Sequence, residues 1–124
     1  MARALIALTK RIAKRHGERP VEPAPLGPVR GNGFDAITAE ALYPRWANFI
    51  KPNDIVIAET GTSSMGLAFA LLPKGATFHN QTLWGAIGWA TPAAFGAAVA
   101  APDRRVVLIT ADGSYQAFGL KKRH

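Results

Sequence analysis

The sequence contains no cysteine among its 124 residues, which excludes disulfide bonds and thiolate metal sites. The absence of cysteine fits the cytoplasmic location that we predict for the chain. Acidic residues are also scarce, because 8 Asp and Glu stand against 15 Lys and Arg, for a formal net charge of +7. Such an excess of positive charge is typical of chains that bind nucleic acid or an anionic surface.

The positive charge is concentrated near the two ends of the chain. Basic residues cluster in residues 10–19 and again in residues 121–123, whereas residues 75–102 contain no Asp, Glu, Lys or Arg. A charge-free segment could cross a membrane, but a span needs roughly 20 strongly apolar residues. This segment is mostly Ala, Gly and Thr and has Pro92 within it. We therefore expect a buried helix there and no membrane span.

The amino-terminal third of the chain divides into a basic segment and a linker. In residues 2–16, Leu5, Leu8 and Ile12 recur at spacings of three and four, which predicts an amphipathic helix with a basic opposite face. A surface-binding basic helix and a mitochondrial presequence are two alternative interpretations of the same pattern. Residues 19–33 contain four prolines and three glycines, which is typical of a semi-rigid linker.

The central part of the chain has the pattern of an α/β fold. Residues 55–59 and 106–110 are two short, almost wholly apolar runs, as found in strands that are covered on both faces. Residues 76–80 are a third, weaker strand candidate. We therefore predict the fold class α/β, with a partial parallel sheet flanked by helices.

Two helices are expected beside these strands. Thr38 can cap a helix over residues 39–50, in which Pro44 introduces a kink or divides the helix into two short ones. Residues 84–101 are expected to form a long helix that is entered through the glycine-rich turn of residues 84–88.

Small residues follow both apolar runs. Residues 60–64 read TGTSS and residues 111–114 read ADGS. The carboxyl ends of parallel strands are where open α/β sheets hold phosphorylated ligands. A carboxylate such as Asp112 beside a glycine and a serine is suited to holding Mg²⁺ against a diphosphate. Each of these two short segments is, by itself, also typical of an ordinary turn, and residues 60–64 lack the lysine of a P-loop.

Three segments taken together resemble a known family. They are residues 58–63 (AETGTS), 84–88 (WGAIG) and 112–116 (DGSYQ), in this order and spacing. This arrangement is similar to the cofactor domain of thiamine diphosphate-dependent 2-oxo acid decarboxylases, in particular the indolepyruvate, phenylpyruvate and pyruvate decarboxylases. The resemblance divides the chain into a basic helix and linker (1–33), a partial thiamine diphosphate-binding domain (34–116) and a basic tail outside the family pattern (117–124).

The resemblance implies roles for individual residues. Those expected to hold the diphosphate, or Mg²⁺ in the case of the aspartate, are Gly61, Thr62, Ser63, Asp112, Gly113 and Ser114. On the pyrimidine side, the Gly85 carbonyl would accept from the 4′-amino group, and Ala86 would line the site. Ile87 would force the cofactor into a bent shape, which brings its 4′-imino nitrogen to the thiazolium C2–H.

The chain also departs from the family pattern. Ala111 stands where the family has glycine, and no Asn of the Mg²⁺ site is recognisable after Asp112. The domain that carries the family's glutamate partner of the aminopyrimidine is not recognisable either. The resemblance therefore implies a decarboxylase fragment that is inactive alone, so whether this chain is an enzyme by itself stays open.

The 2-oxo acid cannot be chosen from the sequence. Partners implied by the resemblance are that substrate in a completed enzyme, and a second copy or a full-length decarboxylase as a docking partner. The alternative hypothesis is a non-catalytic basic protein that binds nucleic acid or an anionic surface.

Overall fold

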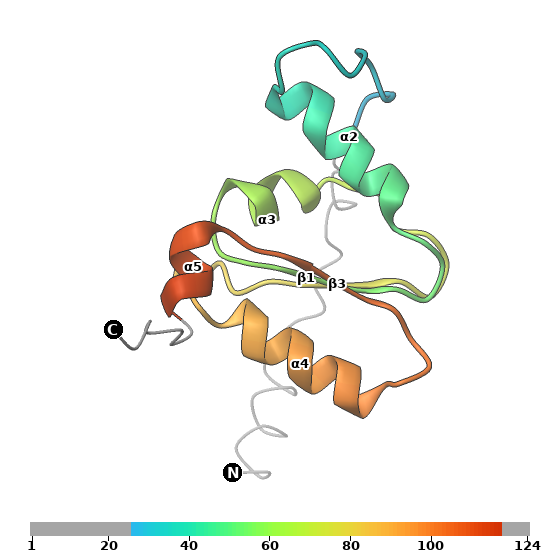
Figure 1. Cartoon of the computed structure of the whole chain (residues 1–124). Coiled ribbons are helices and arrows are strands. Elements are labelled where there is room, and N and C mark those ends of the chain that lie inside the picture. Colours follow the sequence, from blue (N-terminus) through green and yellow to red (C-terminus); the bar gives the residue numbers. More distant parts are fainter. Residues whose placement is uncertain (1–25, 118–124) are drawn as a thin grey trace, which may run out of the picture.

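The computed structural model describes residues 26–117, so the predicted helix of residues 2–16 and most of the basic tail lie outside the described residues. Helices and strands alternate along the described chain (Figure 1). In order they are α2 (Ala39–Phe49), β1 (Ile55–Ala58), α3 (Thr62–Leu67), β2 (Thr77–His79), α4 (Ala90–Ala100), β3 (Val106–Ile109) and α5 (Asp112–Ala117).

The three strands form one parallel sheet in the order β2-β1-β3. Ile55 of β1 is in register with Thr77 of β2 and with Val106 of β3. Helices α2 and α3 lie on one side of this sheet and α4 lies on the other (Figure 1). The predicted α/β class, with a partial parallel sheet flanked by helices, is confirmed.

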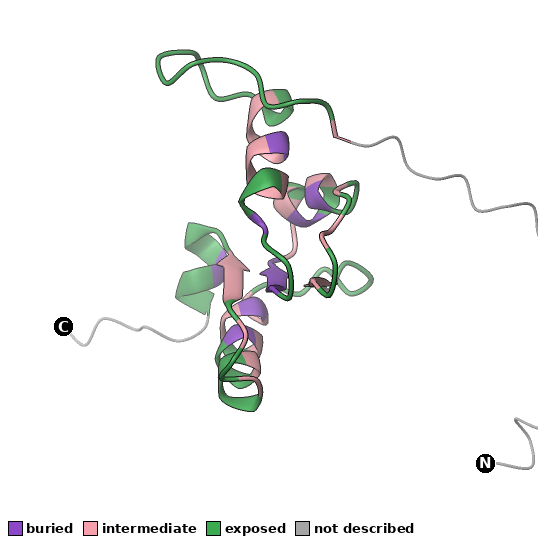
Figure 2. Cartoon of the chain, turned by 90° about the vertical axis from the view of Figure 1, so that its right-hand side faces the viewer, coloured by how far each residue is buried: buried purple, intermediate pink, exposed green. Residues whose placement is uncertain are grey.

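The central strand β1 is buried along its whole length (Figure 2). Ile55 and Ile57 face α4 and form a core cluster with Ala90 and Ala94. Alternation along a strand turns Val56 and its neighbour Ala58 to the opposite face, and both are fully buried. Helices on both faces explain why an uninterrupted apolar run, rather than an alternating one, encodes this strand.

Helix α2 begins as predicted, because the Thr38 hydroxyl accepts a hydrogen bond from the Ala41 N–H at 3.3 Å. It continues as one helix through Pro44, so the alternative of two short helices is wrong. Proline removes one backbone hydrogen bond from a helix interior. Pro44 is buried, and the neighbouring Tyr43 donates from its hydroxyl to the Thr62 carbonyl of α3 at 2.8 Å. Packing of this kind offsets the local cost of the proline.

Helix α4 is shorter than expected, since it starts at Ala90 rather than at residue 84. Gly85 and Gly88 have φ angles of 62° and 85°, in the left-handed region that a right-handed helix excludes. Residues 112–117 form the short helix α5 instead of the expected turn, with Asp112 in its first turn. A carboxylate at this position interacts favourably with the helix dipole. No helix in the described range is long and apolar enough to cross a membrane.

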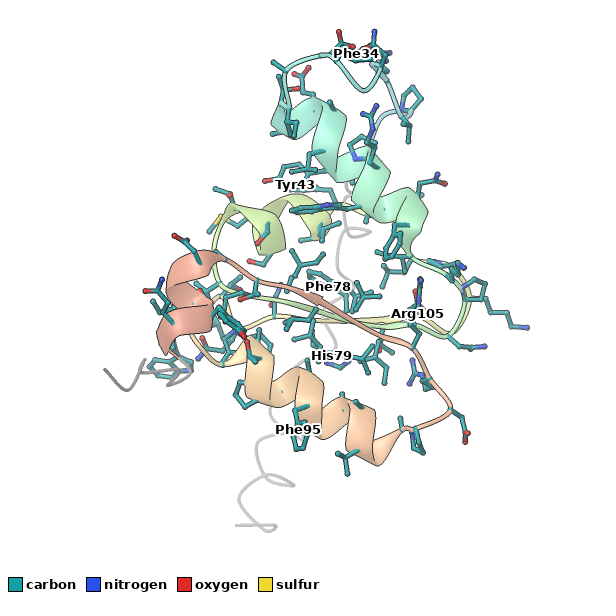
Figure 3. All side chains as sticks on the ribbon, viewed as in Figure 1. Phe34, Tyr43, Phe78, His79, Phe95 and Arg105 are labelled. Carbon is teal, nitrogen blue, oxygen red and sulfur yellow. The ribbon has the colours of Figure 1, made fainter. Side chains whose placement is uncertain are left out.

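The amino ends of β1 and β3 are joined by an ion pair. Asp54 is 2% exposed, and Arg105 donates to its carboxylate from Nε at 2.9 Å and from Nη2 at 2.5 Å. Arg105 also donates to the Phe49 carbonyl and lies over the Phe49 ring, so it ties α2 to this edge (Figure 3). The hydrogen bonds from Arg105 hold the pKa of Asp54 below its ordinary value of 3.8.

This pair predicts a pH-dependent contribution to stability. A lowered carboxyl pKa in the folded state stabilises the fold fully above the unfolded value of 3.8, and the contribution is lost as pH falls through the lowered folded value. We expect Asp54→Asn to reduce the free energy of unfolding at pH 7, and the difference from wild type to shrink below pH 3.8. Urea denaturation over this pH range measures the effect. Glu40→Gln, which changes an exposed acid of α2, is the control. A difference that stays constant down to pH 2 would contradict the prediction.

The contact between α2 and α3 predicts opposite effects at two helical glycines. A Cβ on Gly66 would lie 2.3 Å from the Tyr43 ring, which faces α3 (Figure 3), whereas a Cβ on Gly96 of α4 would meet no atom within 4 Å. We expect Gly66→Ala to destabilise the chain by about 1–3 kcal/mol through overpacking. Gly96→Ala should stabilise it by roughly 0.5–1 kcal/mol through helix propensity. Thermal unfolding of both variants measures this, and equal shifts in one direction would refute the packing argument.

Candidate functional site

The three segments singled out in the sequence lie at the carboxyl edge of the sheet, next to the ends of the three strands. Residues 59–63 follow β1 and residues 110–114 follow β3, and the loop of residues 80–89 joins β2 to α4. The Glu59 N–H donates to the Ile109 carbonyl at 2.8 Å, which continues the β1–β3 pairing beyond the strand ends. Strand order reverses between β1 and β3, and ligands of open α/β sheets bind outside such a switch point.

The turn after β1 is fixed from two sides. Gly61 precedes α3 with a φ of 143°, so this backbone conformation favours glycine. The hydroxyl of buried Ser64 donates to the Gly61 carbonyl at 2.9 Å, and Tyr43 binds the next carbonyl, that of Thr62. Thr62 is exposed and Ser63 half-buried at the start of α3.

The turn after β3 presents Asp112 and Gly113 to solvent, whereas Ser114 is 4% exposed. A Cβ on Gly61 or on Gly113 would meet no atom within 4 Å, so space is open beside the backbone of both turns. The backbone at this edge is therefore accessible to a ligand, while the Ser114 side chain is largely covered.

The 80–89 loop carries the remaining predicted residues. Gly85 is exposed in the left-handed region, and Ile87 is 56% exposed. Ala86 is held on both sides, since its N–H donates to Gln81 Oε1 at 3.1 Å and its carbonyl accepts from Thr60 Oγ1 at 2.9 Å. The residue between Gly85 and Ile87 is thus fastened to the end of β1.

Glu59 is the residue at this edge for which the sequence predicted no role. Glu59 is 1% exposed, and among residues 26–117 its carboxylate accepts hydrogen bonds only from backbone N–H groups. Oε1 accepts from Thr60 N at 3.1 Å, and Oε2 accepts from Gly88 N at 3.1 Å and from Ala90 N at 3.3 Å. The sequence signal that could have revealed this role is a glutamate directly after an apolar strand, because a carboxylate buried there needs hydrogen-bond donors.

The metal site expected from the sequence has a single side-chain ligand here. Among residues 26–117 no cluster of three or more His, Asp and Glu could hold a metal ion. Exposed Asp112 nonetheless fits Mg²⁺ chemistry, because Mg²⁺ is usually bound by one or two carboxylates together with substrate phosphates and water. Hollows of about 430 and 370 Å³ lie beside α2 and between α4 and β2, and none of the predicted site residues lines them.

Comparison with known proteins identifies a family model that matches the second half of the chain. Residues 59–121 match the family "Thiamine pyrophosphate enzyme, C-terminal TPP binding domain". The match begins at the buried glutamate, includes all three segments except Ala58, and extends into the segment 117–124 that the sequence pattern had set apart.

Similar curated proteins carry the name alpha-keto-acid decarboxylase. The chain is 43% identical to the protein of Mycobacterium ulcerans over 119 residues, which cover 94% of this chain and 21% of that protein. It is 42% identical to the protein of Mycolicibacterium paratuberculosis, with the same coverage. The Mycobacterium tuberculosis protein is 46% identical over 82 residues, 66% of this chain and 15% of that protein. The chain therefore spans about a fifth of the length of these relatives. On the family match and these identities, the chain belongs to the thiamine pyrophosphate-dependent 2-oxo acid decarboxylase family and represents part of its carboxyl-terminal cofactor-binding domain.

Proposed function

We propose that this chain forms the diphosphate and aminopyrimidine side of a thiamine diphosphate site. The observation that supports it best is the convergence of three separated segments at the carboxyl edge, two of them flanking the β1/β3 switch point.

The diphosphate is proposed to lie against the turns after β1 and β3. The open space beside Gly61 and Gly113 allows phosphate oxygens to approach backbone N–H groups. Thr62 and Ser63 supply hydroxyl groups, and Asp112 supplies a carboxylate to Mg²⁺. The buried position of Ser114 favours its backbone N–H over its hydroxyl as the contacting group.

The aminopyrimidine is proposed to lie against the 80–89 loop. Exposed Gly85 offers its carbonyl as an acceptor, and the exposed side chain of Ile87 offers a bulky apolar support beside it. The N–H of Ala86 is already paired, so Ala86 contributes its methyl group. When bound, thiamine diphosphate supplies a thiazolium ring that accepts the electron pair released as a 2-oxo acid loses CO₂.

The reaction that we propose for the assembled enzyme is the non-oxidative decarboxylation of an aromatic or small 2-oxo acid to an aldehyde. The names of the relatives support the reaction class, and the chain spans 21% of the first of them. The remaining active-site groups would then come from further protein, either a second copy or a full-length decarboxylase on which this chain docks.

Calorimetric titration of thiamine diphosphate with Mg²⁺ into the 124-residue chain tests the binding site. We expect saturable binding that Asp112→Ala weakens by at least about tenfold, because a charge-assisted contact contributes roughly 1.5–3 kcal/mol. Asp103→Ala, which removes an exposed aspartate from the turn before β3, should bind like wild type. Absence of binding by a folded wild-type chain, or equal binding by both variants, would refute the proposed site.

A second experiment tests whether the chain needs further protein for catalysis. We expect the isolated chain with saturating cofactor to release no CO₂ from phenylpyruvate or indolepyruvate, because a cofactor held on one side lacks the remaining groups. A coupled aldehyde assay and CO₂ detection measure this, with a full-length alpha-keto-acid decarboxylase as the positive control. Turnover by the isolated chain would contradict the need for further protein.

A further inference from the structure

We propose that Glu59 and Thr60 are positioning residues that hold the 80–89 loop in the shape needed on the pyrimidine side of the cofactor. This inference rests on the proposed function, and it assigns a role to two residues that would not themselves touch the pyrimidine. Both stand directly after β1, the most buried strand of the sheet.

The Glu59 carboxylate connects β1 to the end of the loop. Its two oxygens accept hydrogen bonds from three backbone N–H groups, two of which belong to Gly88 and Ala90, 29 and 31 residues further along the chain. Helix α4 has Trp89 as its N-cap residue, which makes no side-chain capping bond. Glu59 therefore supplies from another element the acceptor that the first N–H groups of a helix require. Its negative charge also complements the amino end of the helix dipole.

The Thr60 hydroxyl connects β1 to the beginning and middle of the same loop. Its Oγ1 lies 3.0 Å from the Gln81 carbonyl and 2.9 Å from the Ala86 carbonyl, so its proton is shared between them. The Gln81 side chain closes this arrangement by accepting from the Ala86 N–H. Glu59 and Thr60 thus fasten the loop at both ends and at its centre.

Few other contacts hold this loop within the part of the chain that the structure describes. Its large apolar side chains are exposed, with Leu83 at 94%, Trp84 at 84% and Ile87 at 56%. Gly85 and Gly88 both adopt left-handed backbone angles on either side of Ala86 and Ile87. Glycine is conformationally permissive, so such a segment keeps one shape only where surrounding contacts impose it.

The consequence is a fixed relation between the two halves of the site. Glu59 and Thr60 immediately precede Gly61 in the diphosphate turn, so one short segment carries that turn and also holds the loop. The loop would contact the pyrimidine, whereas the turns after β1 and β3 would contact the diphosphate. Loosening the loop should thus weaken binding of the whole cofactor but leave binding of pyrophosphate alone unchanged.

The test compares two probes on the full chain, thiamine diphosphate with Mg²⁺ and inorganic pyrophosphate with Mg²⁺. The variants are Glu59→Gln, which keeps the side-chain shape but replaces one acceptor oxygen by an NH₂ group that would face a backbone N–H, and Thr60→Val, which removes the shared hydroxyl. We expect each to weaken thiamine diphosphate binding by about tenfold, the effect of roughly 1.4 kcal/mol, and to leave pyrophosphate binding within about twofold of wild type. Glu40→Gln makes the same chemical change as Glu59→Gln at an exposed position of α2, outside the proposed site, and should bind both probes like wild type.

Amide hydrogen exchange of the ligand-free chain gives a second measurement that does not depend on cofactor binding. Exchange at Gly88 and Ala90 should accelerate in Glu59→Gln while that at Val56 and Ile57 of β1 stays slow. If Glu59→Gln unfolds the whole chain, Thr60→Val, whose side chain is only half-buried, decides the question.

The outcomes separate the two proposals. A wild-type chain that binds neither probe overturns the proposed function, and the positioning role with it. A wild-type chain that binds both, with Thr60→Val binding both unchanged or weakening both equally, overturns the positioning role alone. A loss confined to thiamine diphosphate supports both.

Discussion

The arrangement depends on parallel pairing of the short strand β1 with a neighbour on each side. All four of its residues are buried, and helices on opposite faces of the sheet cover its two rows of side chains. Because the three strands run in the same direction, the segments that follow them meet at one edge although they are some tens of residues apart in the chain. Reversal of strand order on the β3 side leaves room outside β1 and β3, where adjoining helices do not cover the strand ends. The position of the candidate site is therefore a consequence of topology before any polar side chain is considered.

Each end of β1 carries a buried carboxylate, and the two serve different purposes. Asp54 at the amino end is 2% exposed and paired with the Arg105 guanidinium, so one charge is balanced by another. Glu59 at the carboxyl end is 1% exposed and is satisfied by backbone N–H groups. An isolated buried carboxylate is costly unless its lone pairs find donors, and the amino end of a helix concentrates such donors. The Asp54–Arg105 pair joins two strands and α2, whereas Glu59 joins β1 to the loop that precedes α4.

The strands could be predicted from the sequence because each is a local apolar run, and the Thr38 cap because its bond spans three residues. Predictions were poorer where distant contacts decide the conformation. Helix α2 passes through Pro44 because it packs on α3, and α4 begins late because Gly85 and Gly88 turn left-handed under restraint from β1. The three candidate site segments were proposed from resemblance, but the structure was needed to connect Glu59 with N–H groups 29 and 31 residues away. No local pattern encodes a contact of that separation, and only the burial of a charged residue hints that it must exist.

The apolar surface of α4 bears on what completes the site. This helix contains no charged residue, and among the described residues only its side facing β1 and β3 is packed. Phe95 (Figure 3) is 73% exposed and Val99 is 68% exposed. A helix that is apolar on all sides is normally enclosed by protein. Leu83 and Trp84 add a second exposed apolar group beside the proposed pyrimidine side. The second of these two apolar surfaces borders the proposed site. Their positions favour an arrangement in which further protein covers α4 and also encloses the proposed cofactor. Water would then be excluded by the same association that supplies the remaining groups, which links assembly to catalysis in the proposed enzyme.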